Sequence, residues 1–400
     1  MREIKLDYDD VMIEPEIVSE IRSRRECDYK VDGMCPIWAA PMDTVISENN
    51  WRDFVDLGIN VVLPRTIPLD RRLVLLSRFA ITRNHPFISF SLDEANDIFL
   101  REENRFELRK TEEPVSGRFY IRNSIPVICT EKAPMKICID IADGHMRAQI
   151  DLIAKIKERF GNTILIMGGN IASPKTYELY EKAGCSYLRV GVGGGSACLT
   201  ASNTGVYYPL FSLMKDTYEV KKAINGKCKI IADGGIRLNR DIQKALIYAD
   251  YVMIGSLFNR AIESAGKTTY GSFYWNVRGK KIYRPLKTLL YYGREVKKND
   301  YPKVVKLIKE NKLSVWKEFR GMSTKDVQKA ILVANGKNSD IKLKTSEGKV
   351  MHQKVEYSLE GWLENEIDAL RSSMSYCDSR NLEEYKESKW NKVNGIRYNK

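Results

Sequence analysis

The sequence has 400 residues, of which 43% are hydrophobic and 29% charged, a composition that is typical of a folded globular protein and excludes a disordered chain. No apolar run approaches the roughly 18 residues of a transmembrane helix, and the N-terminus lacks the apolar core of a signal peptide. The net charge of +13 favours anionic ligands or forms a solvated basic face; nucleic acid is not expected, because no nucleic-acid-binding module accompanies the charge.

From residue 36 to residue 256 the sequence repeats a unit made of a short apolar run, a polar turn and an amphipathic stretch. Runs that are apolar at consecutive positions are typical of strands buried on both faces. Eight such runs lie at 36–40, 59–63, 87–90, 137–141, 164–167, 187–190, 230–232 and 251–254. Helical patterns are clearest at 146–160, 175–183 and 239–248. These elements predict a single (β/α)₈ TIM-barrel domain over residues 1–400, with the stretch 100–127 as its least regular part.

Turns rich in glycine and polar residues follow six of these runs. They lie at 41–44, 143–145, 168–170, 191–196, 233–235 and 255–256. In a (β/α)₈ barrel such turns meet on the face formed by the carboxyl ends of the strands, where the active sites of this fold are built. We therefore expect the functional residues on this face.

The pattern changes after Gly255. Residues 270–287 alternate around Arg278-Gly279 and predict a β-hairpin, and residues 302–311 predict a lysine-rich helix. Together they predict a hairpin and helix inserted after strand eight, at about 265–318. A mobile active-site flap is expected at about 324–350, followed by an amphipathic helix at 359–372 that closes the barrel and a charged tail at 383–400.

The strongest local pattern is the loop Gly191-Val-Gly-Gly-Gly-Ser-Ala-Cys198. Four glycines in five positions free backbone amides to bind an anion, and Ser196 adds a hydroxyl donor. A thiol two residues further on lies in an electropositive pocket that favours the reactive thiolate. The alternative is a flexible loop with an inert cysteine. The eight cysteines form no CxxC pair, which predicts reduced thiols, a cytoplasmic location and no zinc site.

This loop resembles the signature Gly-x-Gly-Pro-Gly-Ser-x-Cys-Thr-Thr of the IMP dehydrogenase/GMP reductase family. Further motifs of that family match, in order, at 6–11, 40–45, 167–170, 232–235, 253–256, 320–323 and 370–374. The resemblance implies that Cys198 attacks carbon 2 of a purine nucleotide and forms a covalent intermediate. It also implies that the family's oligomers, tetramers or larger, are formed here.

The resemblance also assigns binding residues. It implies that Asp233 holds the ribose hydroxyls, that Ser196, Gly235, Gly255 and Ser256 hold the 5′-phosphate, and that Met322, Ser323 and Gly348 lie along the base. It implies that Met42, Asp140 and Asn170 face a nicotinamide cofactor, and that backbone carbonyls of Gly193, Gly195 and Cys198 bind a monovalent cation such as K⁺. An acid at a strand end is also a common turn former, so Asp140 and Asp233 have a structural alternative. His145 is interpreted as a surface or cofactor-edge residue.

Three features make the sequence more similar to the GMP reductase branch, which uses NADPH to convert GMP into IMP and ammonia. Residues 204–209 resemble the reductase sequence Thr-Gly-Val-Gly-Tyr-Pro. Residues 346–349 match its Ser-Glu-Gly-Lys, which implies that Glu347 and Thr200 form the proton relay. The stretch from Gly321 to Glu347 is shorter than the dehydrogenase flap and lacks its Arg-Tyr pair.

The sequence departs from the family pattern at several places. Gly194 replaces the proline of the loop, Leu199 the first threonine after the cysteine, and Ala201 the arginine that follows. An insertion lies at about 283–316. These departures leave the exact substrate open, including a deoxynucleotide or modified purine. The alternatives to a reductase are IMP dehydrogenase-like oxidation with NAD and a catalytically silent nucleotide-binding protein.

Overall fold

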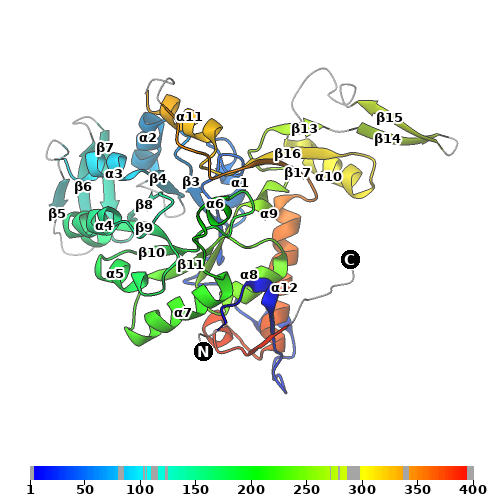
Figure 1. Ribbon diagram of the computed structural model, residues 1–400, viewed down its shortest axis with the longest axis horizontal. Helices are drawn as coiled ribbons and strands as arrows, with labels where there is room; N and C mark the ends of the chain where they lie inside the picture. The colour runs from blue at the N-terminus through cyan, green and yellow to red at the C-terminus, as the bar shows by residue number, and fades with distance from the viewer. Residues whose placement is uncertain are drawn as a thin grey trace.

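The fold was analysed in a computed structural model that describes residues 4–79, 85–101, 104, 106–109, 116–121, 125–270, 272–277, 280–285, 298–336 and 342–393. At its centre, eight parallel strands close into a barrel in the order β10-β11-β12-β2-β3-β4-β8-β9. They are β2 (Ile37–Ala39), β3 (Asn60–Leu63), β4 (Phe87–Phe90), β8 (Met135–Ile139), β9 (Ile164–Ile171), β10 (Tyr187–Val190), β11 (Lys229–Asp233) and β12 (Tyr251–Ile254). The predicted (β/α)₈ barrel is confirmed (Figure 1).

The eight predicted runs are the eight barrel strands, but the bounds differ most at β8 and β9. Strand β8 begins and ends two residues earlier than the predicted run, so Asp140 follows the strand. Strand β9 continues to Ile171, so Gly168, Gly169 and Asn170 belong to its end rather than to a separate turn. Asn170 therefore stands on the rigid wall of the barrel, beside the end of β10, to which β9 is paired.

Helices surround the barrel because each has one apolar face. In α4 (Arg147–Phe160), the buried Ile150, Ile153, Ile156 and Phe160 recur at helical spacing. The other surrounding helices are α1 (Trp51–Val55), α2 (Leu69–Phe79), α3 (Leu92–Phe99), α5 (Thr176–Lys182), α7 (Leu210–Ala223), α8 (Asn239–Leu246) and α12 (Leu359–Tyr376). Short helices α6 (Thr200–Thr204) and α9 (Ser256–Asn259) begin in the loops that follow β10 and β12.

The stretch that was least regular in the sequence forms a separate small sheet. Strands β5 (Phe106–Arg109), β6 (Ser116–Ile121) and β7 (Ile125–Thr130) pair antiparallel in the order β5-β6-β7 between α3 and β8. This sheet lies at the edge of the molecule and is no part of the barrel (Figure 1).

The segment after β12 carries the second irregular region. Strands β14 (Ser272–Val277) and β15 (Lys280–Pro285) form an antiparallel pair that projects away from the barrel, and α10 (Tyr301–Lys309) follows (Figure 1). The predicted turn Arg278-Gly279 and residues 286–297 lie outside the described residues. Near α10 a small apolar core contains Ile262, Val304, Val305, Ile308, Leu313, Val315 and Val355.

A second antiparallel sheet leads back to the barrel face. It consists of β13 (Thr268–Tyr270), β16 (Val315–Arg320) and β17 (Val350–Lys354), in the order β13-β16-β17. Helix α11 (Lys325–Ala334) lies between β16 and β17, within the stretch predicted as a flap, of which residues 337–341 are outside the described residues. Sequence positions 321–323 and 346–349 therefore lie at neighbouring ends of β16 and β17.

The two ends of the chain meet on the barrel. Strand β1 (Val11–Ile13) pairs antiparallel with β18 (Trp390–Lys392), and α13 (Leu382–Tyr385) buries Tyr385. The part of the predicted charged tail that the structure describes is thus packed; residues 394–400 lie outside it. None of the described helices combines the length and the apolar character that crossing a bilayer requires.

Candidate active site

Cys198 lies in the loop between β10 and α6, on the face formed by the carboxyl ends of the barrel strands. It is partly exposed, whereas the seven other cysteines are buried. Its Sγ donates a hydrogen bond to Thr200 Oγ1 at 3.3 Å, and Thr200 Oγ1 donates to Glu347 Oε2 at 2.7 Å. The structure therefore brings the three predicted catalytic residues into one continuous chain.

Glu347 reaches this position because its backbone pairs with the cysteine loop. Leu199 N donates to Glu347 O at 2.6 Å, and Lys349 N donates to Ala197 O at 3.0 Å, which places Gly348 opposite Cys198 in an isolated antiparallel bridge. Two loops that are far apart in the sequence are thus joined at Cys198. The carboxylate is fixed by backbone geometry and not only by its own side chain.

The turn that carries Met322 and Ser323 lies against the same loop. Gly321 N donates to Lys349 O at 3.1 Å, and Gln328 Nε2 donates to Ser323 O at 3.0 Å. At the base of this turn Arg320 forms an ion pair of 2.5 Å with Asp43, the neighbour of Met42. The turn predicted to bind the base is therefore held both against the loop that carries Cys198 and against the turn after β2.

The residues predicted to hold a phosphate come from three strand ends. Ser196 belongs to the loop after β10, Gly235 follows β11, and Gly255 and Ser256 follow β12. The Met42 sulfur lies 2.8 Å from the place where a Cβ would stand on Gly255, so a side chain there would require Met42 to move. Gly235 N donates to Gly194 O at 3.0 Å. This amide, predicted to bind phosphate, instead joins the loop after β10 to the loop after β11 in this structure.

A buried charge network lies under the site. Arg189, in β10, has a side chain only 4% exposed and lies 3.0 Å from Asp140 and 3.9 Å from Asp233. Arg65 lies 3.3 Å from the other oxygen of Asp140. Asn170 Nδ2 donates to Asp233 Oδ2 at 2.7 Å. The two predicted acids are therefore partners of one arginine. Asn170, which was predicted to face the cofactor together with Asp140, forms a hydrogen bond with Asp233, the residue predicted to hold the ribose.

The two acids respond differently to this setting. Burial tends to raise the pKa of Asp140, but Arg189 and Arg65 outweigh it and hold that pKa below its usual value. Burial raises the pKa of Asp233 above its usual value, and Arg189 and Asn170 offset this only in part. Asp140 is thus held in its charged form more strongly than Asp233.

Comparison with known proteins identifies the family of this chain. A family model described as the IMP dehydrogenase / GMP reductase domain matches residues 127–310. The GMP reductase of Streptococcus pneumoniae is 31% identical over 304 residues, which cover 70% of this chain and 83% of that protein. The chain belongs to the IMP dehydrogenase/GMP reductase family.

Other relatives cover more of the chain or lie in the other branch of the family. The GMP reductase of Lysinibacillus sphaericus is 29% identical over 340 residues, 84% of this chain and 92% of that protein. An inosine-5′-monophosphate dehydrogenase of Chlorobaculum parvum is 31% identical over 253 residues, 63% of this chain but 44% of the dehydrogenase. The family membership predicted from the sequence is confirmed.

The cation site implied by the family resemblance stays a prediction. Among its three carbonyls, that of Gly195 accepts a hydrogen bond from Cys198 N at 2.9 Å. A carbonyl oxygen has a second lone pair, so this bond is compatible with a cation contact. His145 lies beside Asp143, with Nδ1 3.0 Å from its carboxylate, and its Nε2 accepts from Ala172 N, so both ring nitrogens have partners.

Sequence reasoning missed the residues that support the site. Arg189 and Arg65 were not singled out, nor was the ion pair between Arg320 and Asp43. One signal was present: Arg189 is a charged residue inside the apolar run 187–190, and a charge in a buried strand requires a partner. The identity of that partner depends on which strand ends meet across the barrel.

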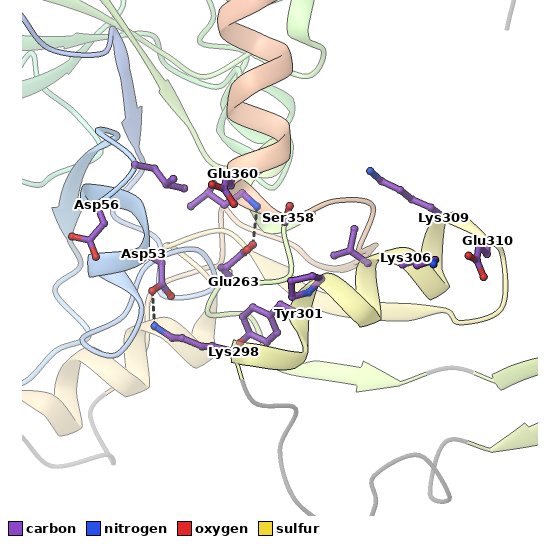
Figure 2. A pocket seen from close by; sticks show the side chains of 14 residues that line it. Asp53, Asp56, Glu263, Lys298, Tyr301, Lys306, Lys309, Glu310, Ser358 and Glu360 are labelled. Atoms are coloured by element: carbon purple, nitrogen blue, oxygen red, sulfur yellow. Dashed lines mark hydrogen bonds and ion pairs between the residues drawn. The ribbon is translucent and has the colours of Figure 1, made fainter.

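A pocket of about 850 Å³ lies elsewhere, between α1, α10 and the start of α12 (Figure 2). Its lysines come from α10 and the turn before it. Its carboxylates come mainly from the barrel side, and Glu310 at the end of α10 adds one on the side of the lysines. Lys298 and Asp53 join the two sides through an ion pair of 2.5 Å, and Glu263 accepts from Leu359 N at 2.9 Å (Figure 2). None of the predicted site residues lines this pocket.

Proposed function

We propose that this protein is an NADPH-dependent reductase that converts GMP into IMP and ammonia through a covalent adduct on Cys198. The observation that carries this proposal is the hydrogen-bonded chain from Cys198 through Thr200 to Glu347. Oxidation of IMP has no amine to protonate, whereas loss of ammonia needs a proton donor at the leaving group. A hydroxyl held by a carboxylate beside the nucleophile supplies that donor.

The proposed reaction has two steps at carbon 2 of the purine. The Cys198 sulfur forms a bond to carbon 2, the C–N bond to the amino group breaks, and the amine leaves as ammonia with a proton passed from Glu347 through Thr200. A hydride then joins carbon 2, the S–C bond breaks, and its electron pair returns to sulfur. In sum, GMP, NADPH and two protons give IMP, NADP⁺ and ammonium.

The remaining residues bind and orient. Asp233 accepts hydrogen bonds from the ribose hydroxyls, Ser196, Gly255 and Ser256 offer donors to the 5′-phosphate, and the turn at 322–323, with Gly348, flanks the base. The nicotinamide cofactor supplies the hydride when bound. Amide and carboxylate groups of Asn170 and Asp140 suit its carboxamide. The buried Arg189 Nε has no hydrogen-bond partner in the described residues, and this unsatisfied polar atom near Asp140 supports a polar ligand on this side. Met42 completes this side.

A direct assay tests the proposal against its nearest alternative. The purified protein is mixed with GMP and NADPH, and in parallel with IMP and NAD⁺, while absorbance at the nicotinamide band is followed. We expect absorbance to fall with GMP and NADPH, and IMP and ammonium to appear in equal amounts. Oxidation of IMP without GMP turnover would reassign the protein to the dehydrogenase reaction, and turnover of neither would favour a nucleotide-binding protein.

Further parts of the proposal have separate tests. We propose a cytoplasmic homo-oligomer, a tetramer or larger, which light scattering of the purified protein measures directly. Replacing K⁺ by Na⁺ or Li⁺ in the assay tests the predicted cation at the carbonyls of Gly193, Gly195 and Cys198. Replacing NADPH by NADH, and GMP by its deoxy form, tests the two remaining choices of cofactor and substrate.

A further inference from the structure

Leu210, the first residue of α7, lies against the loops after β10 and β11, which both belong to the proposed phosphate-binding site. Its Cδ1 is 2.4 Å from the place where a Cβ would stand on Gly194 and 2.2 Å from the corresponding place on Gly235. Its Cδ2 is 3.4 Å from that of Gly191, and the residue is 2% exposed. One apolar side chain thus touches the loop after β10 and the loop after β11.

The backbone around Leu210 is held firmly by the N-terminal segment. Leu210 N donates to Asp7 Oδ1 at 2.8 Å, and Tyr207 Oη donates to the same oxygen at 2.7 Å. Two residues further into α7, Ser212 exchanges two hydrogen bonds with Leu6, at 2.8 and 3.0 Å. Leu210 therefore cannot move away from the glycine loops without breaking contacts that lie more than 200 residues away in the sequence.

Gly194 fits this arrangement. Unlike Gly193, it does not have a positive φ, so its backbone conformation alone permits a side chain. The nearest obstacle is Leu210, and behind it Gly235 N at 3.1 Å from the Cβ position. The signature that this loop resembles has a proline there, which restricts the backbone by its ring. Here a glycine stands in place of the proline and lacks that restriction. The side chain of Leu210 occupies the space where a side chain at position 194 would lie.

We propose that Leu210 is a positioning residue that sets the separation of the two phosphate-binding loops, and that Gly194 and Leu210 act as a matched pair. The hydrogen bond from Gly235 N to Gly194 O closes the two loops above the leucine side chain. Emptying the space at Leu210, or adding a side chain at Gly194, changes the loop spacing and so changes binding of the 5′-phosphate more than binding of the nucleoside. The proposal rests on the proposed function only in taking a purine 5′-monophosphate as the ligand.

The test uses Leu210→Ala, Gly194→Ala and the double variant, with calorimetric binding of GMP and of guanosine to the full-length protein. We expect Leu210→Ala and Gly194→Ala each to weaken GMP binding by roughly tenfold or more, with a much smaller effect on guanosine. The double variant should recover most of the GMP affinity, because the added methyl occupies space that the leucine vacates. Recovery should be incomplete, since Gly235 N stays close to the new Cβ.

Leu213→Ala is the matched control. Leu213 is another fully buried leucine of α7, and its side chain is not among the nearest neighbours of the three glycines. It should lower the melting temperature, as Leu210→Ala does, while leaving the ratio of GMP to guanosine affinity unchanged. A Leu210→Ala variant that weakens both ligands equally, or a double variant whose losses simply add, would overturn the proposal.

The binding test of the Gly194–Leu210 pair can fail or succeed independently of the activity assay that tests the proposed function. If the wild type binds a purine monophosphate but does not reduce GMP, the proposed function fails and the pairing of Gly194 with Leu210 is still measured with GMP or IMP as the ligand. If GMP is reduced but the two substitutions do not compensate each other, the pairing fails and the function stands.

Discussion

At the scale of single residues, the site depends on side chains that lie far apart in the sequence. Cys198 and Thr200 come from one loop, and Glu347 comes from a segment that β16 and β17 bring across the barrel face. The sequence pattern predicts all three because each falls in a recognisable motif. Arg189 and Arg65 fall in none, and only the closed barrel shows that they neutralise Asp140 from two sides.

The proton relay makes a residue-level prediction. Glu347→Gln keeps the size of the side chain but cannot supply the proton, so we expect kcat for GMP reduction to fall by about 100-fold or more, with little change in KM. Thr200→Val should have a similar effect, and Thr200→Ser, which keeps the hydroxyl, should retain most of the activity. Steady-state oxidation of NADPH measures all three. Unchanged kcat in Glu347→Gln would show that the proton comes from elsewhere.

Arg189 makes a second prediction at this scale. Arg189→Leu leaves Asp140 and Asp233 buried without their shared cation, which should lower the free energy of unfolding by about 3 kcal/mol near neutral pH. In the wild type the lowered pKa of Asp140 contributes stability that is present above its usual pKa and lost as pH falls. The difference between the two proteins should therefore shrink towards about pH 4, where the carboxyl groups take up protons.

Urea unfolding at the two pH values measures this difference. The control is Arg147→Leu, which removes an exposed arginine paired with Asp151 on the surface of α4 and should change stability by less than about 0.5 kcal/mol. An Arg189→Leu protein with wild-type stability at neutral pH would mean that Arg65 alone neutralises the network.

At the scale of elements, the sequence predicts the strands whose consecutive residues are all buried. The barrel strands are buried on both faces, so their sequences are apolar at every position and stand out. Strands β5 to β7 were not predicted: Phe106-Glu107-Leu108-Arg109, for example, alternates polar and apolar residues and forms no continuous apolar run. The position of Glu347 likewise depends on β-pairing between distant segments, which no local pattern contains.

The helix α12 makes a prediction about pH. Glu366 is fully buried in it, Gln243 Nε2 donates to its Oε1 at 2.7 Å, and burial raises its pKa from 4.5 to about 8. The folded protein therefore binds a proton that the unfolded chain has released, so stability should fall as pH rises from about 4.5 to about 8, by up to roughly 4 kcal/mol. Glu366→Gln should remove this decline and be the more stable protein near pH 8.

Chemical unfolding across that pH range tests the prediction. Glu364→Gln, an exposed change on the same helix, should leave the pH profile as it is in the wild type. If Glu366→Gln and wild type decline in parallel, the buried carboxyl is not the group that titrates.

At the scale of the whole molecule, the barrel brings together loops from distant parts of the chain on one face and leaves the small sheet and the projecting hairpin outside it (Figure 1). Cys198, Thr200, Glu347 and the charge network around Arg189 all lie on that face. The pocket against α10 lies apart from that face (Figure 2). Strand β16, which runs from the α10 region to Arg320, connects the two regions (Figure 1). The basic charge of the chain suits an enzyme whose substrate and cofactor are both anionic.

Replacement of the amino group on carbon 2 of GMP by a hydride is the chemical change that defines the proposed function. The most direct measurement uses NADPH that carries deuterium at both C4 positions, with mass spectrometry of the IMP that forms. We predict IMP with one deuterium at carbon 2, released together with ammonium, and no such product from Cys198→Ala. IMP without deuterium, or labelled IMP from Cys198→Ala in wild-type yield, would contradict the account.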